Sequence, residues 1–221
     1  MRDATRGPAD DSDSADDCCC TTATRNPETP IGSHWIGRDS VLEAELPDPL
    51  KTRLGRLIGN RSVDTFADWV TEIRQFTGGG SISVEDLCHA ASETDHWGEL
   101  DGKRYDFRCF YDAVILAALA DEPVDIRTVS PEGSAITAKA IGTSDLTVSP
   151  EQAVFSFGVA ANVEGPADGE PSAAEVYAAV CPYVRAFRSP AAYAGWAEEV
   201  SAATVGMPLQ GATSLAAALV E

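Results

Sequence analysis

Residues 108–120 have the sequence RCFYDAVILAALA, which begins with polar and aromatic residues and continues as an apolar segment. Asp121-Glu122-Pro123 follows and should end a helix, since proline cannot continue one. We therefore predict a buried helix in this stretch, and we expect the rest of the chain to be organised around it.

Cys109 and Asp112 are three residues apart in this stretch, which on a helix places a thiol and a carboxylate on one face. A thiolate is a soft nucleophile and a ligand for soft metals, and a carboxyl group can carry a proton. The pair suggests soft-metal chemistry with a proton donor attached. If Asp106 is the N-cap, Cys109 lies in the first turn, where the helix dipole favours a thiolate. The alternative is an incidental pair, a small buried cysteine beside a solvated aspartate.

The composition is unusually acidic. The chain has 221 residues, enough for one core with a small additional domain, and its 35 acidic and 16 basic residues give a net charge of −19. Such a surface repels nucleic acid and anionic membranes, and it suits a protein that stays soluble in concentrated salt. We therefore expect no nucleic-acid partner, no membrane partner and a salt-loving source.

The six cysteines are too few for a disulfide framework, which indicates reduced thiols. The start of the chain lacks the apolar region of a secretory signal, and no apolar run is long enough to span a membrane. We therefore predict a cytoplasmic protein.

The chain divides into three predicted parts. Residues 1–38 form a disordered acidic arm that carries Cys18, Cys19 and Cys20, which either capture soft metal or are an accidental cluster. Residues 39–105 form a winged-helix-like helical domain, with helices over 48–59, 63–76 and 83–92 and a hairpin that turns at Asp101-Gly102. Because this domain is acidic and its third helix has no basic stripe, we expect the domain to have a packing or lid role rather than to bind DNA.

Residues 106–221 form the predicted catalytic core. Strands are predicted over 124–129, 134–141 and 153–159. Two helices are predicted to begin at Ser172 and Pro190, and a third is predicted over 214–220. The helix that begins at Ser172 must end near Pro182, which leaves Cys181 at its end. The predicted fold class is α+β, with the winged-helix-like domain followed by a mixed β-sheet core and flanking helices.

The remaining cysteine and histidine residues give weaker signals. We interpret Cys88 as a core residue, His34 as part of a linker, and His96 as a surface or interface residue. No pair of histidines has metal-ligand spacing.

From about residue 95 to residue 221 the chain resembles the organomercurial (alkylmercury) lyase family, with a weaker likeness through the preceding helices. The matching motifs occur in the family's order: a Cys-x-x-Asp that heads an apolar helix, a Val-Ser-Pro-x-Gly turn at 129–133, and the strand Val-Phe-Ser-Phe at 154–157. Cys181 follows, eight residues before Ser189 and fifteen before Trp196, and a short apolar helix ends the chain. With its acidic composition, the chain resembles a haloarchaeal-like, acidic member of this family.

The resemblance implies a cytosolic enzyme that cleaves the carbon–mercury bond by protonolysis, giving a hydrocarbon and Hg(II). By position, Cys109 and Cys181 look like the two mercury-binding thiolates, and Asp112 looks like the acid that relays the proton and helps hold the metal. The family needs no organic cofactor or catalytic metal. It releases Hg(II) to low-molecular-weight thiols or to a mercuric reductase, which we expect as partners.

Three departures from the family pattern stand out. Ser130 replaces a usual cysteine, thought to be structural, so we expect the change to bear on stability rather than chemistry. Pro182 follows Cys181 where relatives often carry a second cysteine, and Ala117-Ala118 stand where proline is common. The alternative function is a non-catalytic mercury or copper binding or sensing protein that uses the same thiols but has no need of Asp112.

Overall fold

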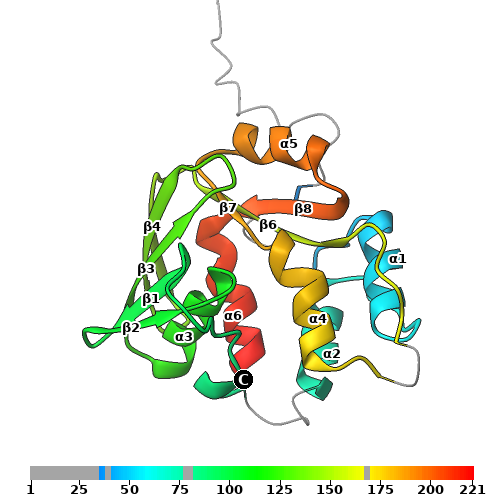
Figure 1. Cartoon of the computed structure of the whole chain (residues 1–221), viewed down its shortest axis with the longest axis horizontal. Helices are drawn as coiled ribbons and strands as arrows, with labels where there is room; N and C mark the ends of the chain where they lie inside the picture. Colours follow the sequence, from blue (N-terminus) through cyan, green and yellow to red (C-terminus); the bar gives the residue numbers. More distant parts are fainter. Residues whose placement is uncertain (1–34, 38–40, 77–81, 167–169) are drawn as a thin grey trace, which may run out of the picture.

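The computed structural model describes residues 35–37, 41–76, 82–166 and 170–221. Helix α3 (Tyr111–Ala120) lies between a β-sheet and helix α6 (Ala212–Val220), and every residue from Tyr111 to Ala118 is buried (Figure 1). This confirms the predicted buried helix, which ends at Asp121 in the left-handed conformation with φ 51°. The predicted N-cap is wrong, because Asp106 is the last residue of strand β2 and pairs with Trp97. Cys109 therefore precedes the helix.

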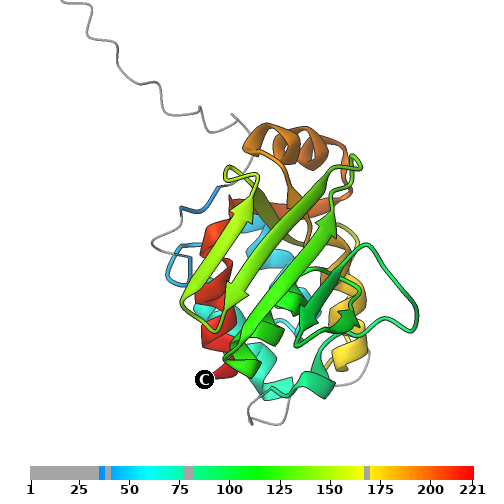
Figure 2. The same cartoon turned by 90° about the vertical axis from the view of Figure 1, so that its left-hand side faces the viewer.

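A five-stranded sheet covers one side of α3 (Figure 2). Helix α3 contacts β1, β3 and β4, and a Cβ added at Gly98 would come within 3.1 Å of the Ala113 Cβ. Glycine at this position therefore lets the sheet approach the helix closely. The strand order is β2-β1-β3-β4-β5, formed by Trp97–Leu100 (β1), Lys103–Asp106 (β2), Pro123–Val129 (β3), Ala135–Ile141 (β4) and Asp145–Ser149 (β5).

A second, three-stranded sheet has the order β7-β6-β8, formed by Val154–Ala160 (β6), Ala186–Phe187 (β7) and Ala202–Pro208 (β8). All strand pairs in both sheets are antiparallel, so the predicted mixed sheet is wrong. Short turns reverse the chain between β1 and β2 and between β3, β4 and β5, and antiparallel pairing follows from such turns. The predicted strands over 124–129, 134–141 and 153–159 are confirmed as β3, β4 and β6.

In the described ranges, five further α-helices pack around α3 and the two sheets. Helix α6 packs against α3 and α2, α4 packs against β6, and α5 covers the second sheet (Figure 1). Their bounds agree closely with the predicted ones: Asp48–Leu57 (α1), Phe66–Phe76 (α2), Ala173–Val180 (α4), Pro190–Glu199 (α5) and Ala212–Val220 (α6). At the start of α4, Ser172 and Glu175 form the capping box that the sequence predicted.

The helix predicted over 83–92 is wrong. Only Val84–Asp86 forms a 3₁₀ turn (η2), and Leu87 is already extended, with ψ 151°. The Ser83–Asp86 hydrogen bonds that suggested a helix start are present, but they cap this short turn alone. In addition, the β1–β2 hairpin pairs with β3 instead of projecting as a wing. The winged-helix outline is therefore not confirmed.

The division of the chain at residue 106 stays a prediction. The core residues on the two sides of it, Leu50 and Leu54 on one and Val114 and Leu116 on the other, belong to one packed cluster. The last described residues of the predicted arm lie against β8, where the Ile36 amide donates to the Gly206 carbonyl at 2.9 Å. Among the described residues no helix is long and apolar enough to cross a membrane.

Candidate active site

Cys109 and Asp112 are in direct contact where the chain enters α3. The Cys109 Sγ donates to Oδ2 of Asp112 at 3.0 Å, and both side chains are buried. Asp112 is in the first turn of the helix and Cys109 lies just before the N-cap residue Phe110. The expected proximity of the thiol and the carboxyl group is thus found, although the two residues do not share one helix.

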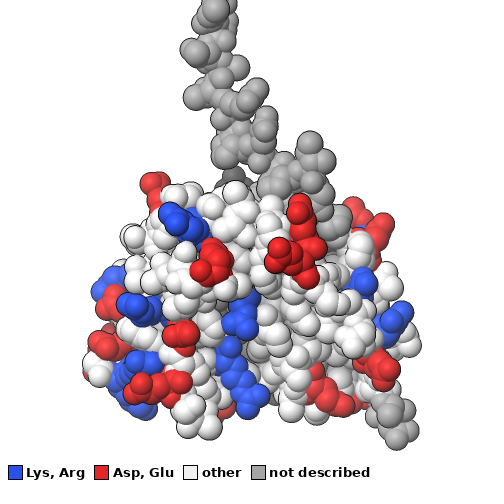
Figure 3. All heavy atoms as spheres, turned by 45° about the horizontal axis from the view of Figure 1, so that its top comes forward, with Lys and Arg blue, Asp and Glu red and all other residues white. Residues whose placement is uncertain are grey.

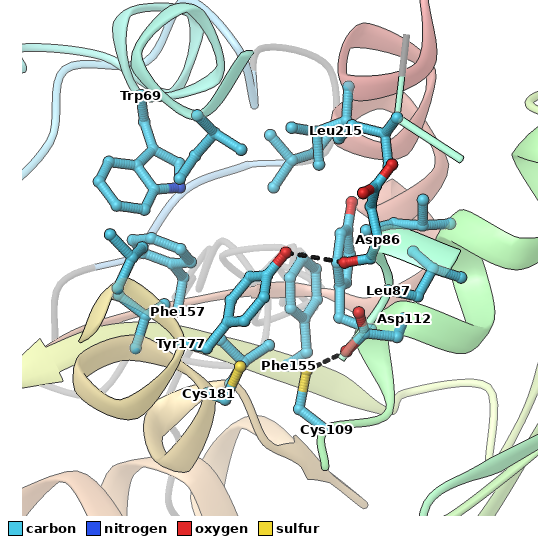
Figure 4. A pocket seen from close by; sticks show the side chains of 18 residues that line it. Trp69, Asp86, Leu87, Cys109, Asp112, Phe155, Phe157, Tyr177, Cys181 and Leu215 are labelled. Atoms are coloured by element: carbon cyan, nitrogen blue, oxygen red, sulfur yellow. Dashed lines mark hydrogen bonds between the residues drawn. The ribbon is translucent and has the colours of Figure 1, made fainter. Parts of the chain in front are cut away.

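Cys181 is brought to the same place by the end of α4. It is the C-cap residue of that helix, and Pro182 follows in a second 3₁₀ turn, η3 (Cys181–Tyr183). The predicted end of this helix is therefore confirmed. The Cys181 thiol interacts with the Cys109 thiol, and Figure 4 shows both sulfur atoms at the same end of a pocket.

Cys88 is the site residue that sequence reasoning missed. Its backbone N–H donates to Oδ1 of Asp112 at 3.0 Å, and the Cys181 thiol lowers the pKa of Cys88. Its side chain is buried, as expected of a core residue. The signal that could have found it is the predicted hairpin, because a hairpin brings the segments before and after it together. The Arg108 amide indeed donates to the Cys88 carbonyl at 3.0 Å.

Burial sets the protonation chemistry of this group. It raises the pKa of Asp112, and the hydrogen bonds from the Cys88 amide and the Cys109 thiol only partly offset this effect. The Cys181 thiol lowers the pKa of Cys109, but burial and the Asp112 carboxylate outweigh it, so the pKa of Cys109 is raised. A basic carboxylate that faces a thiol proton is suited to taking up that proton and passing it on.

An apolar pocket with a cavity volume of about 110 Å³ extends from this group. Trp69 lies at the opposite end of the pocket from the two sulfur atoms (Figure 4). The Tyr177 hydroxyl donates to the Asp86 carbonyl at 2.9 Å and so joins α4 to η2 beside the pocket. The remaining lining is almost wholly apolar: Ile73, Ile82, Leu87, Tyr111, Ile115, Phe155, Phe157, Val176, Val180, Val184, Leu215 and Leu219.

His96 was predicted to be a surface or interface residue, and this is wrong, since it is 8% exposed. Its Nδ1 lies 2.7 Å from the Thr128 hydroxyl, and its Nε2 accepts from Arg185 at 2.7 Å. Desolvation and the Arg185 charge lower the pKa of His96 to about 4, so the ring is neutral. His96 therefore ties the start of β1 to β3 and to the segment just after η3.

The other predicted candidates are placed as follows. Ser130 is buried in the turn after β3, where its hydroxyl accepts from the Ser134 amide at 3.0 Å. His34 and the Cys18–Cys20 triplet lie outside the described residues. In the described ranges there is no group of three or more His, Cys, Asp or Glu side chains arranged to hold a metal ion.

Three comparisons with known proteins were made. A family model described as alkylmercury lyase matches residues 90–221, a range that contains Cys109, Asp112 and Cys181 but begins after Cys88. Among solved structures, the mercury-bound form of MerB2 is similar, with 16% sequence identity, coverage of 71% of this chain and 75% of that chain, and a TM-score of 0.46. The comparison with curated proteins gave no match.

Proposed function

This chain belongs to the alkylmercury lyase family and is an enzyme that cleaves carbon–mercury bonds, and we propose that Cys109, Cys181 and Asp112 carry out its reaction. One observation supports this assignment above all others. Two thiols and a buried carboxyl group meet at one end of a pocket whose other walls are apolar.

The proposed reaction begins when the Cys109 thiol binds the mercury of the substrate. Its proton passes to the Asp112 carboxylate, 3.0 Å away, whose pKa is raised by burial. Cys181 supplies the second thiolate, and its proton leaves with the thiol that delivered the organomercurial.

Bond cleavage follows from this arrangement. Two thiolates increase the electron density on the mercury-bound carbon, which then accepts a proton more readily. Asp112 gives its proton to that carbon, and the electron pair of the carbon–mercury bond becomes the new carbon–hydrogen bond. R–Hg–SR′ and two enzyme thiols thus yield R–H, R′SH and Hg(II) held by Cys109 and Cys181.

We propose that the apolar pocket holds the organic group during this reaction. Burial of an apolar group against these side chains is favourable, and the exclusion of water strengthens the charge interactions at the sulfur atoms. The reaction balances without an organic cofactor. Low-molecular-weight thiols or a mercuric reductase then accept the Hg(II), in agreement with the exchange chemistry of thiolate ligands.

The direct test supplies phenylmercury with excess thiol and measures benzene. Cys109→Ser and Cys181→Ser should each abolish benzene formation, and thermal unfolding should verify that each variant is folded. The measurements should be made in a background in which Cys18, Cys19 and Cys20 are Ser, so that mercury retention reports on the described thiols. If mercury is bound but the unsubstituted enzyme forms no benzene, the chain is instead a binding or sensing protein.

We further propose a cytoplasmic, salt-adapted protein with no nucleic-acid partner. The net charge of −19 supports this proposal. Acidic side chains (red) lie among the basic ones (blue) on the face seen in Figure 3. Screening of such a charge should stabilise the fold, so the melting temperature should rise when molar KCl is added. A melting temperature that falls would count against adaptation to salt.

A further inference from the structure

A hydrogen-bond donor faces into the far end of the apolar pocket. Trp69 lies at the end opposite the sulfur atoms, and it is only 5% exposed. Figure 4 shows its indole nitrogen on the side of the ring that faces into the pocket. The backbone N–H of Trp69 donates to the Thr65 carbonyl at 3.2 Å, but the indole N–H has no hydrogen-bond partner among the described residues. A donor placed in this way is suited to an acceptor on a bound ligand.

The other polar side chains of the pocket that lie away from the thiols already have partners in the protein. The Tyr111 hydroxyl donates to the Ala212 carbonyl at 2.6 Å, and the Tyr177 hydroxyl donates to the Asp86 carbonyl at 2.9 Å. The Asp86 carboxylate accepts from the amide and the hydroxyl of Ser83 at 2.9 and 2.7 Å. In the described lining, the indole N–H is therefore the donor that remains for a substrate.

Neighbouring rings hold the indole in its orientation. The Trp69 ring packs edge-on against Phe157 with the ring centroids 5.7 Å apart, and Phe157 packs edge-on against Phe66 at 5.0 Å. Trp69 and Phe66 are buried residues of α2, and Phe157 belongs to β6. Because a helix and a strand together fix the ring, the direction of the N–H group is set before a substrate binds.

We propose that Trp69 determines specificity, because its indole N–H binds a neutral hydrogen-bond acceptor at the end of the organic group remote from mercury. This inference rests on the proposed function. None of the described residues that line the pocket is Lys, Arg or His, so a carboxylate at this end would be buried without a counter-charge. A carbonyl group, as in an aryl ketone, accepts the hydrogen bond without carrying a charge. An organic group that fills the pocket but lacks an acceptor displaces water and leaves the N–H unpaired.

The test compares two substrates of the same shape, 4-acetylphenylmercury and 4-isopropenylphenylmercury, in which a C=O group replaces a C=CH₂ group. With excess thiol, the unsubstituted enzyme should have a KM about fivefold lower for the acetyl compound, the effect of one hydrogen bond. Trp69→Phe keeps an aromatic ring but removes the N–H, so its two KM values should be equal. The ratio of the two kcat values should be the same in both proteins, because the substituents affect bond cleavage alike in each.

Trp97→Phe is the matched control, since Trp97 is a tryptophan on β1 that does not line the pocket. This variant should keep the fivefold preference, and thermal unfolding should verify that both variants are folded. The charged analogue 4-carboxyphenylmercury should have a higher KM than the isopropenyl compound in the unsubstituted enzyme. A lower KM for the carboxylate would overturn the assignment of a neutral acceptor.

The outcomes separate this inference from the proposed function. If the unsubstituted enzyme forms neither acetophenone nor α-methylstyrene, the proposed function itself is refuted. If both products form but the two KM values are equal, the role of Trp69 alone is refuted. A preference that persists in Trp69→Phe, or one that is lost in Trp97→Phe as well, also refutes it.

A second measurement needs no variant. In the unsubstituted protein labelled with ¹⁵N in tryptophan, acetophenone should shift one indole N–H proton signal downfield, the direction that a new hydrogen bond causes. The matched compound α-methylstyrene should not produce this shift. Equal responses to the two compounds would overturn the inference.

Discussion

The buried His96 ring predicts a specific dependence of stability on pH. Desolvation and the Arg185 charge lower its pKa in the folded protein from 6.5 to about 4. Between these two values the unfolded chain binds a proton that the folded protein does not, so stability must fall as the pH falls through this interval. Above pH 6.5 the ring is neutral in both states, and its contribution is fully present.

The magnitude follows from the size of the interval. Each pKa unit corresponds to about 1.4 kcal/mol, so acidification from roughly pH 7.5 to roughly pH 5 should cost about 2 kcal/mol through His96. Burial raises the pKa of Asp112, and this shift makes stability change with pH in the opposite direction to that of His96. A comparison with a variant that lacks the ring removes these shared contributions.

The variant is His96→Gln, whose amide can still accept from Arg185 and does not titrate. Urea unfolding at the two pH values gives the free energy of unfolding for each protein. The unsubstituted protein should lose about 2 kcal/mol more than the variant on acidification. Equal losses would refute the reasoning, because they would mean that His96 titrates alike in the folded and unfolded states.

Two further substitutions test the site and the core. Asp112→Asn should lower the single-turnover rate by about 10²- to 10⁴-fold, the usual contribution of a positioned acid or base, while Asp125→Asn, at an exposed carboxylate on β3, should leave it unchanged. A normal rate in Asp112→Asn would remove Asp112 from the mechanism. Gly206→Ala should destabilise the fold by about 1–3 kcal/mol in urea unfolding, since its Cβ would lie 2.4 Å from the buried Tyr193 ring. An unchanged midpoint would show that the ring moves aside at no cost.

Local chemistry made much of the fold and site predictable. The apolar run after Asp112 could only be a buried helix, and Pro182 required α4 to end at Cys181. The start of α3 was less predictable, because Asp106 is a suitable N-cap in sequence but is already paired in β2. The partners of Cys181 depend on tertiary packing, and here the resemblance to a family supplied what the spacing could not.

Cys88 and His96 show where sequence reasoning fails. The sequence around Cys88 has the capping signal of a helix, but the chain extends after one turn and its polar groups pair with Asp112 and Arg108. His96 is polar and lies between Asp95 and Trp97, which suggests exposure, yet Thr128 and Arg185 satisfy both ring nitrogens. In each case the residues that determine the local structure are distant in sequence. The same is true of strand β8, which was not predicted and pairs with the distant strand β6.

Mercury bound by Cys109 and Cys181 would join the start of α3 to the end of α4, which are far apart in the sequence. In this respect the ion resembles a disulfide bond, which restricts the unfolded chain more strongly as the closed loop lengthens. The product complex should therefore resist unfolding more than the free enzyme does. Each turnover then passes through a cross-linked state, and the thermal stability of the protein becomes a measure of how much mercury it still carries.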